Sequence, residues 1–310
     1  MERDWRSMMD LGLVHFMAWP QIITDQGPIV ETAAEIAADE FFNVLEVRRS
    51  MQPQVVSGLK RVSDVSGLRL GVGAQPGLLL NKLDLNSSDA DARKAAINEV
   101  KASIDFAAEL GSPLVACLSG PDPGEEQRDG AIDLLVDSLV QLCEHGQEKG
   151  GEDPIWISLE QFDHKYDKKC LVGPSEVAVR VAYRVRDNAP NFGLCVDLSH
   201  IPLLEESIAD CLLAVKDHLI HVHAGNCIMK DESHDAYGDM HPRFGHPDGE
   251  NGVEELKTYI ETLIYGGYFE ADVPTAKPVF TFEVKPLEGE TTALVIANAK
   301  RTFIDAWTAL

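Results

Sequence analysis

Hydrophobic positions along the chain fall into two alternating kinds of segment. Short runs rich in β-branched and aromatic residues are separated by longer stretches whose leucines, valines and alanines recur at three and four. The longer stretches predict helices, as at 27–40, 91–111 and 207–218. The short runs predict eight strands, at residues 11–18, 41–47, 68–74, 113–119, 154–160, 192–198, 219–225 and 278–284.

This alternation predicts the fold class. Strands that alternate with helices pair in parallel through right-handed crossovers. Eight such units in 310 residues predict a single-domain (β/α)8 TIM barrel over residues 1–310. The competing doubly wound sheet usually carries a glycine-rich phosphate turn after its first strand, whereas WPQII follows here. One long connection, residues 227–252 after the seventh strand, is a candidate active-site lid loop.

Composition narrows the partners and the location. The net charge is −24, from 27 basic and 51 acidic residues, which argues against binding nucleic acid. The only apolar stretch near the N-terminus is too short and polar for a signal peptide or a membrane span. The six cysteines form no CxxC pair, which suits reduced thiols. We therefore expect a cytoplasmic protein without membrane association.

Metal-type ligands close four consecutive predicted strands. Glu160, Asp197, His223 and Glu283 end strands five to eight, on the side of a barrel where active sites form. A single acid at a strand end is more often a cap for the following helix. Carboxylates that converge on one barrel mouth repel one another unless a cation neutralises them. The joint pattern therefore favours a metal site.

The donor set indicates the metal and the chemistry. Three carboxylates and one imidazole suit one divalent ion with open positions, Mn²⁺ first, with Mg²⁺, Co²⁺ or Zn²⁺ as alternatives. Such an ion can chelate a carbonyl and a neighbouring hydroxyl and acidify the carbon between them. Glu160 and Glu283 come from strands separated by two others, so they could flank a substrate and move a proton between its two faces.

These residues resemble a known family. The four ligands, the DLSH element at 197–200 and the HVH element at 221–223 look like those of the xylose isomerase-like TIM-barrel superfamily of sugar and keto-sugar isomerases and epimerases. In its ketose 3-epimerases the equivalent ligands bind Mn²⁺ or a similar ion, and the two glutamates are the acid and the base. The resemblance implies these roles for Glu160 and Glu283, a substrate hydroxyl contact for His200, and a homo-oligomer acting on a small sugar.

The chain departs from the ketose epimerases in ways that keep a lyase open. They carry an arginine where Met229 stands, and an extra glutamate in the stretch that reads QFDHKYD here. Related lyases, such as a keto-inositol dehydratase or the catalytic subunit of a C-glycoside deglycosidase, begin with the same proton removal. The deglycosidase would imply a small partner subunit.

A DNA-repair role is disfavoured. DMH at 239–241 and DLSH are similar to elements of endonuclease IV, a member of the same superfamily. That enzyme needs additional histidines after strands three and four, where this chain reads GVGAQPG and ACLSGPD. The acidic balance also argues against DNA.

Further residues are candidates for substrate contact. His221 shares a side of its strand with His223, where stacking inside the barrel is equally expected. Lys285 shares a side with Glu283 and could polarise a carbonyl or pair with a carboxylate. His241 and Arg243 would reach substrate only if the lid loop closes. For two residues nearer the N-terminus, ordinary barrel filling or rim contacts are the favoured interpretation: His15 and Glu46.

Overall fold

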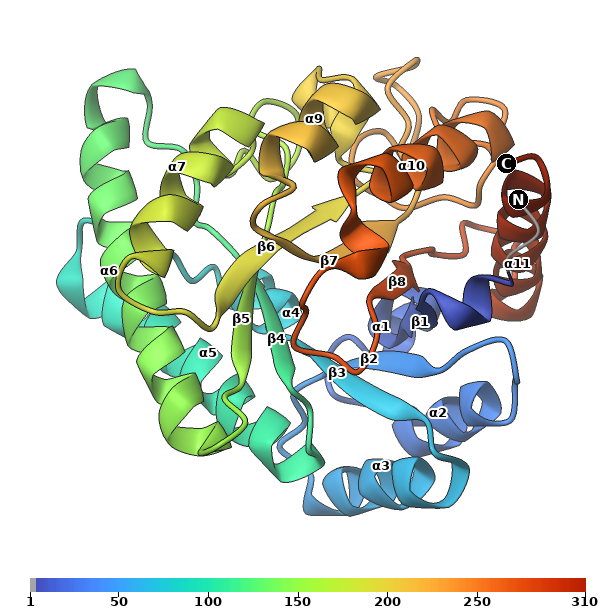
Figure 1. Ribbon diagram of the computed structural model, residues 1–310, viewed down its shortest axis with the longest axis horizontal. Helices are drawn as coiled ribbons and strands as arrows, with labels where there is room; N and C mark the ends of the chain where they lie inside the picture. The colour runs from blue at the N-terminus through green and yellow to red at the C-terminus, as the bar shows by residue number, and fades with distance from the viewer. Residues whose placement is uncertain (1–3) are drawn as a thin grey trace.

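The computed structural model describes residues 4–310 and shows a closed barrel of parallel strands (Figure 1). Each strand pairs with the next along the chain, and the last pairs with the first. The strands are β1 Asp10–Val14, β2 Val44–Arg48, β3 Arg69–Gly73, β4 Leu114–Leu118, β5 Trp156–Glu160, β6 Phe192–Asp197, β7 Leu219–Ala224 and β8 Val279–Phe282. The predicted TIM barrel is confirmed.

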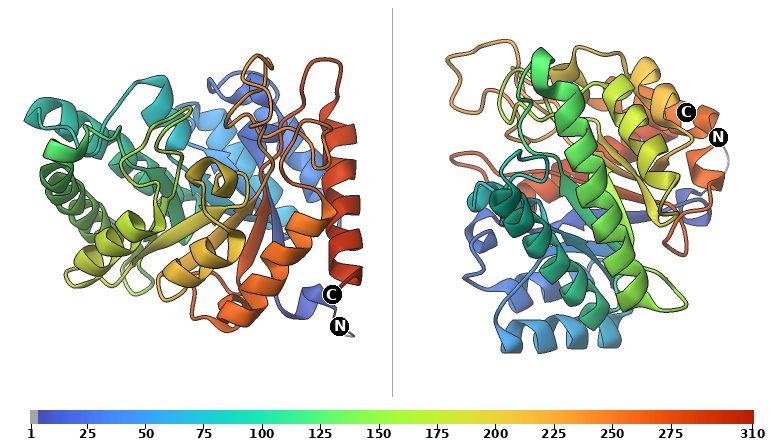
Figure 2. Two further views of the ribbon diagram at one scale, coloured as in Figure 1. Left: turned by 90° about the horizontal axis from the view of Figure 1, so that it is seen from above. Right: turned by 90° about the vertical axis from the view of Figure 1, so that its left-hand side faces the viewer.

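Helices surround the barrel and cover the outer face of the sheet (Figures 1 and 2). The α-helices are α1 His15–Ala18, α2 Ile29–Ala37, α3 Pro53–Ser66, α4 Gln75–Leu80, α5 Ala90–Leu110, α6 Glu125–Gly150, α7 Ser175–Arg186, α8 Ile201–Leu204, α9 Ile208–Val215, α10 Val253–Gly266 and α11 Thr292–Thr308. Three 3-10 turns are η1 Trp5–Ser7, η2 Pro20–Ile22 and η3 Tyr268–Glu270.

Local sequence sets the ends of these helices. The Asp89 carboxylate accepts hydrogen bonds from the backbone N–H groups of Asp91 and Ala92 and so begins α5. The helix ends at Gly111, whose φ of 72° is readily adopted only without a side chain. With these signals α5 begins and ends one residue earlier than the stretch 91–111 predicted from hydrophobic spacing.

The predicted first strand is too long at its C-terminal end. Residues 15–18 form the short helix α1, so His15 begins a helix after β1. Its Nε2 lies 2.8 Å from the Thr32 hydroxyl on α2, and its ring packs edge-on against Trp19. Apolar residues alone do not distinguish a strand from a buried helical turn, which is why the pattern overran the strand.

The apolar core lies between the strands and the helices. Phe280 and Phe282 on β8 meet Phe303 of α11 with ring centroids 5.7 and 5.8 Å apart. Trp5 in η1 packs against Phe303 and Trp307, so the first described turn lies beside α11 near the C-terminus (Figure 2). All six cysteines are buried free thiols. Among residues 4–310, none of the helices is both long and apolar enough to cross a bilayer.

Candidate metal centre

The barrel brings the four predicted ligands to one mouth. Glu160 and Asp197 are the last residues of β5 and β6, His223 is the second-last residue of β7, and Glu283 directly follows β8. All four side chains are buried, and one ligand atom from each lies within 4.8 Å of the others. The parallel register makes this convergence, because the carboxyl ends of all eight strands meet at the same rim.

The atoms of this cluster fit a bound cation. Three of them are buried without a hydrogen-bond partner: Glu160 Oε1, Asp197 Oδ2 and His223 Nδ1. His223 Nδ1 lies 2.8 Å from Glu283 Oε2 and 3.3 Å from Glu160 Oε1. Buried polar atoms are ordinarily satisfied, so unpaired oxygens and a ring nitrogen facing one centre are the donor set expected around a divalent ion. The Glu160, Asp197, His223, Glu283 cluster, here called the quartet, can hold a metal.

The two glutamates of the quartet experience different fields. Burial acts to raise the pKa of Glu160, but the adjacent imidazole of His223 outweighs it and lowers the pKa below its usual value. For Glu283, burial together with the negative charge of Glu160 outweighs the opposing His241 and His223 and raises the pKa. Environments that push two carboxyl groups apart in pKa are typical of an acid and base pair.

His200 is held as a cation next to the quartet and is not a metal ligand. Its Nδ1 lies 2.7 Å from the carbonyl oxygen of Gln161 and its Nε2 lies 3.1 Å from Asp239 Oδ1. Both partners only accept hydrogen bonds, so both ring nitrogens carry protons and neither offers a lone pair. Burial opposes this charge, yet the Asp239 carboxylate raises the pKa of His200 well above its usual value. Phe162 packs on the ring at 4.4 Å.

The loop at residues 227–252, predicted as a candidate lid loop, lies against the barrel mouth and brings His241 to the metal centre. The Asp239 carboxylate accepts from Nε2 of His241 at 2.8 Å as well as from His200. The backbone of His241 has φ 51° and its carbonyl accepts from Lys285 N at 2.7 Å. His241 Nδ1 is buried and lies 3.8 Å from Asp197 Oδ2. Asp239 therefore joins the loop to the barrel beside the quartet.

The other predicted contacts divide by position. His241 and Lys285 line the cavity above the quartet. Arg243 pairs with Glu290 at 3.0 Å and does not line this cavity. His221 faces the barrel interior below His223 and lines a different cavity, at the amino-terminal mouth. Among these predicted substrate-binding residues, His241 and Lys285 therefore lie at the metal centre, whereas Arg243 and His221 do not.

Three polar residues that contact the site were not among the site residues predicted from the sequence, and one of them, Glu46, was assigned to barrel filling or rim contacts. Gln75, at the start of α4, donates to Glu160 Oε2 at 2.8 Å. Glu46, on β2, accepts from His221 and His223. Asp239 joins two histidines, as described above. Gln75 follows the end of β3 by two residues, so the strand-end rule that identified the quartet also applies to it.

The cavity above the quartet, of about 190 Å³, is polar at its base and apolar at its rim. Glu160, His223 and Glu283 lie at the base, together with Lys168, Asp239 and His241 from the loops. Leu79 and Leu80 remain 40% and 50% exposed at the rim. The other apolar residues of the lining are Phe16, Met17, Ile23, Pro76, Phe162 and Met240.

Comparison with known proteins places the chain in a family. Residues 31–292 match the family described as xylose isomerase-like TIM barrel, and the chain belongs to it. This confirms the resemblance drawn from the quartet and the DLSH and HVH elements. No curated protein matches the sequence.

Solved structures share the fold over nearly the whole chain. A D-tagatose 3-epimerase-like protein superposes with a TM-score of 0.70 at 19% identity, over 97% of this chain and 99% of the other. A 3-keto-D-glucoside 4-epimerase from E. coli gives 0.66 at 14%, over 95% and 98%. The IolI protein, solved with a bound zinc atom, gives 0.69 at 17%, over 96% and 98%. At these identities the likeness is one of fold.

Proposed function

We propose that the chain is a divalent-metal-dependent sugar or keto-sugar isomerase or epimerase. The observation that carries the proposal is the quartet itself, whose unpaired buried atoms face one centre while its two glutamates have pKa values shifted in opposite directions. The family and the sugar epimerases among the structural neighbours support the same class. Mn²⁺ is the proposed ion, and the zinc in one neighbour keeps Zn²⁺ as an alternative.

The residues of the chain then have defined tasks. A divalent ion held by the quartet would polarise a substrate carbonyl and acidify the adjacent C–H group. Glu160, whose pKa is lowered, accepts the proton from one face of that carbon, and Glu283, whose pKa is raised, returns one to the other face. His200 can donate a hydrogen bond to a substrate hydroxyl only if that hydroxyl replaces one of the two acceptors that its ring now contacts. His241 and Lys285 contact the substrate from the cavity wall.

One feature of the cavity favours a second candidate function. Its rim is apolar and partly exposed at Leu79 and Leu80, which suits a substituent larger than a free sugar. A lyase that acts on a keto-glucoside would place its aglycone there. This candidate shares the quartet and the first proton removal and differs only in whether a leaving group departs.

A proton-exchange assay tests both candidates. Purified protein with Mn²⁺ in D₂O is incubated with ketoses and 3-keto-glucosides and followed by NMR, with and without chelator. Deuterium uptake beside the carbonyl with the carbon skeleton and substituents intact indicates an isomerase or epimerase. Uptake with a released aglycone or water indicates a lyase. No chelator-sensitive uptake from any member of the panel would contradict both.

The cytoplasmic location, the homo-oligomeric state and the absence of nucleic-acid partners stay part of the proposal. Six buried free thiols and the net charge of −24 support the first and the last.

A further inference from the structure

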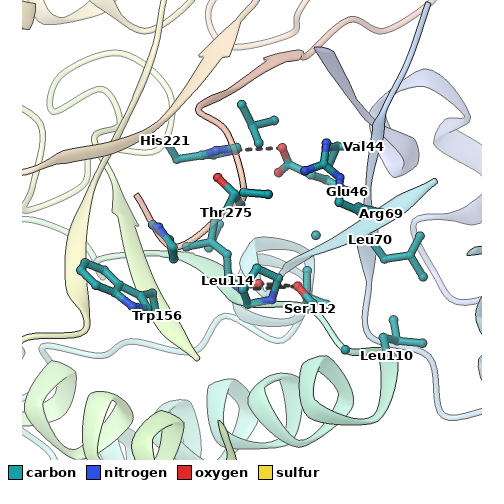
Figure 3. A pocket seen from close by; sticks show the side chains of 18 of the residues that line it. Val44, Glu46, Arg69, Leu70, Leu110, Ser112, Leu114, Trp156, His221 and Thr275 are labelled. Atoms are coloured by element: carbon teal, nitrogen blue, oxygen red, sulfur yellow. Dashed lines mark hydrogen bonds and ion pairs between the residues drawn. The ribbon is translucent and has the colours of Figure 1, made fainter. Parts of the chain in front are cut away.

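Glu46 is a buried carboxylate that contacts two histidines on the opposite side of the barrel. It lies in the middle of β2 and is 4% exposed. Its Oε1 accepts from His221 Nε2 at 2.8 Å, and its Oε2 accepts from His223 Nε2 at 3.1 Å. Figure 3 shows the His221 ring in line with this carboxylate. Both oxygens are thus committed to adjacent rings of β7.

This contact determines which nitrogen of His223 carries the proton. A carboxylate only accepts, so each Nε2 that faces Glu46 holds a hydrogen. Nδ1 of His223 is the atom that points at the quartet, 2.8 Å from Glu283 Oε2. An ion bound by the quartet would take the place of the proton that this carboxylate otherwise attracts to Nδ1, while Glu46 keeps the other proton on Nε2. A metal-binding imidazole needs this arrangement, because a ligand nitrogen must be unprotonated.

The neighbouring strand is shaped to admit the Glu46 side chain. Gly71 on β3 is its register partner. A Cβ atom on Gly71 would lie 2.9 Å from Glu46 Cγ, which is closer than real Cβ contacts come. Glycine weakens a strand interior and often marks a close approach of another group. Gly71 therefore provides the space that this carboxylate occupies.

Glu46 also separates two cavities. It lines the cavity above the quartet and a second one of about 450 Å³ at the amino-terminal mouth, bounded by first residues of strands such as Arg69, Leu114 and Trp156 (Figure 3). His221 lines only the second cavity, and its buried Nδ1 has no partner. His221 thus anchors Glu46 from below without reaching the metal centre.

We propose that Glu46 is the positioning residue of the metal centre: it fixes the Nε2–H form of His223, with His221 as its second anchor, so that Nδ1 is presented to the ion. The inference rests on the metal site of the proposed function and is independent of the sugar chemistry. Carboxylates behind metal-bound histidines typically change metal affinity by about 10- to 100-fold when removed.

The first test measures metal affinity without substrate. Metal-depleted wild type, Glu46→Gln and His221→Gln are titrated with Mn²⁺ by calorimetry, with the fold checked by circular dichroism. We expect Glu46→Gln to raise Kd by about 10- to 100-fold, because an amide presents a donor to one of the two N–H groups. His221→Gln should raise Kd less, since His223 keeps its acceptor. Ser158→Ala removes a buried, unpartnered hydroxyl from β5 and should leave Kd unchanged.

The second test reads the proton position in the wild type and needs no variant to fold. Histidine-selective ¹⁵N labelling of the Zn²⁺-loaded protein, with long-range ¹H–¹⁵N spectra, should show the Nε2–H form for His221 and His223. A folded Glu46→Gln with wild-type Kd, or an Nδ1–H form of His223, would overturn the proposal. Failure of the wild type to bind any divalent ion would overturn it together with the metal site. Normal, Glu46-dependent binding without sugar turnover would refute only the proposed function.

Discussion

The two halves of the barrel contribute different things to the same interior. Strands β5–β7 and the residue after β8 supply the quartet, whereas β1 and β3 carry glycines that pack closely against other side chains. A Cβ on Gly12 would lie 2.5 Å from Thr281 Oγ1, and one on Gly73 would lie 2.8 Å from Gln75 Oε1. One half therefore carries the metal-type ligands, and the other contributes Glu46 and Gln75, which hydrogen-bond to those ligands, together with glycines that pack against neighbouring side chains.

Removing one ligand of the quartet should have the largest effect, a loss of turnover. Glu283→Gln removes one acid/base group and weakens the binding of the metal ion. We therefore expect turnover to fall by about 10²- to 10⁴-fold in the D₂O exchange assay. The fold should persist, since the change removes one of several converging carboxylates.

The matched control is Glu288→Gln, the same change at an exposed glutamate five residues along the chain. It should keep full activity. Full activity in Glu283→Gln would refute the assignment of the quartet.

The second-largest effect is expected when a side chain is added to a glycine of the other half of the barrel. Gly12→Ala forces a methyl group against the Thr281 side chain, and overpacking of this kind costs about 1–3 kcal/mol of unfolding free energy. The Thr281 hydroxyl has no hydrogen-bond partner, so Thr281→Ala makes room at little cost in hydrogen bonding. Urea denaturation should show the double variant close to Thr281→Ala alone. Equal destabilisation by Gly12→Ala in both backgrounds would argue against this contact.

A smaller effect is expected where the lid loop meets the barrel. Asp239→Asn keeps an oxygen toward His200 and His241 but loses the charge, so charge-assisted hydrogen bonds become ordinary ones. We expect hydrogen exchange in residues 227–252 to rise by about tenfold, which corresponds to about 1.4 kcal/mol. Because the contacts of Asp239 are with hydrogen-bond donors, those of His200, His241 and Lys168, metal content should stay near one ion per chain. A loss of bound metal would instead make Asp239 a ligand.

The sequence was sufficient for the barrel and for the quartet because both depend on short-range patterns. Apolar runs fix the strands, and the residue that closes a run lies at the barrel mouth wherever the helices pack. The same reliance on short-range patterns explains why Glu46 was assigned to barrel filling. It lies mid-strand, and only the closed sheet shows that it faces His221 and His223 from the other side of the interior.

The side-chain directions in the loop at residues 227–252 could not be predicted from the sequence. Its residues follow no period, so the sequence predicts a long connection but not which side chains turn inward. His241 reaches the metal centre through a positive φ of 51° that few non-glycine residues adopt, whereas Arg243, two residues on, turns to Glu290. These directions depend on contacts with β6 and β8, which are distant in the chain.

The smallest expected effect concerns two buried histidines, one in each half of the barrel, that differ in charge. His200, in the ligand half, is held charged by Asp239, whereas burial lowers the pKa of His15, directly after β1, to about 3. The unfolded chain protonates His15 near its ordinary pKa of 6.5 and the folded chain does not, so the unfolded state binds more protons as the pH falls. The stability contributed by neutral His15 is present above pH 6.5 and is lost below it. Between pH 6.5 and 5.5 the loss should be about 1 kcal/mol, and His15→Gln, which keeps a polar atom for Thr32, should lack it. Parallel urea titrations of both proteins measure the difference, and identical slopes would show that folding does not shift the pKa of His15.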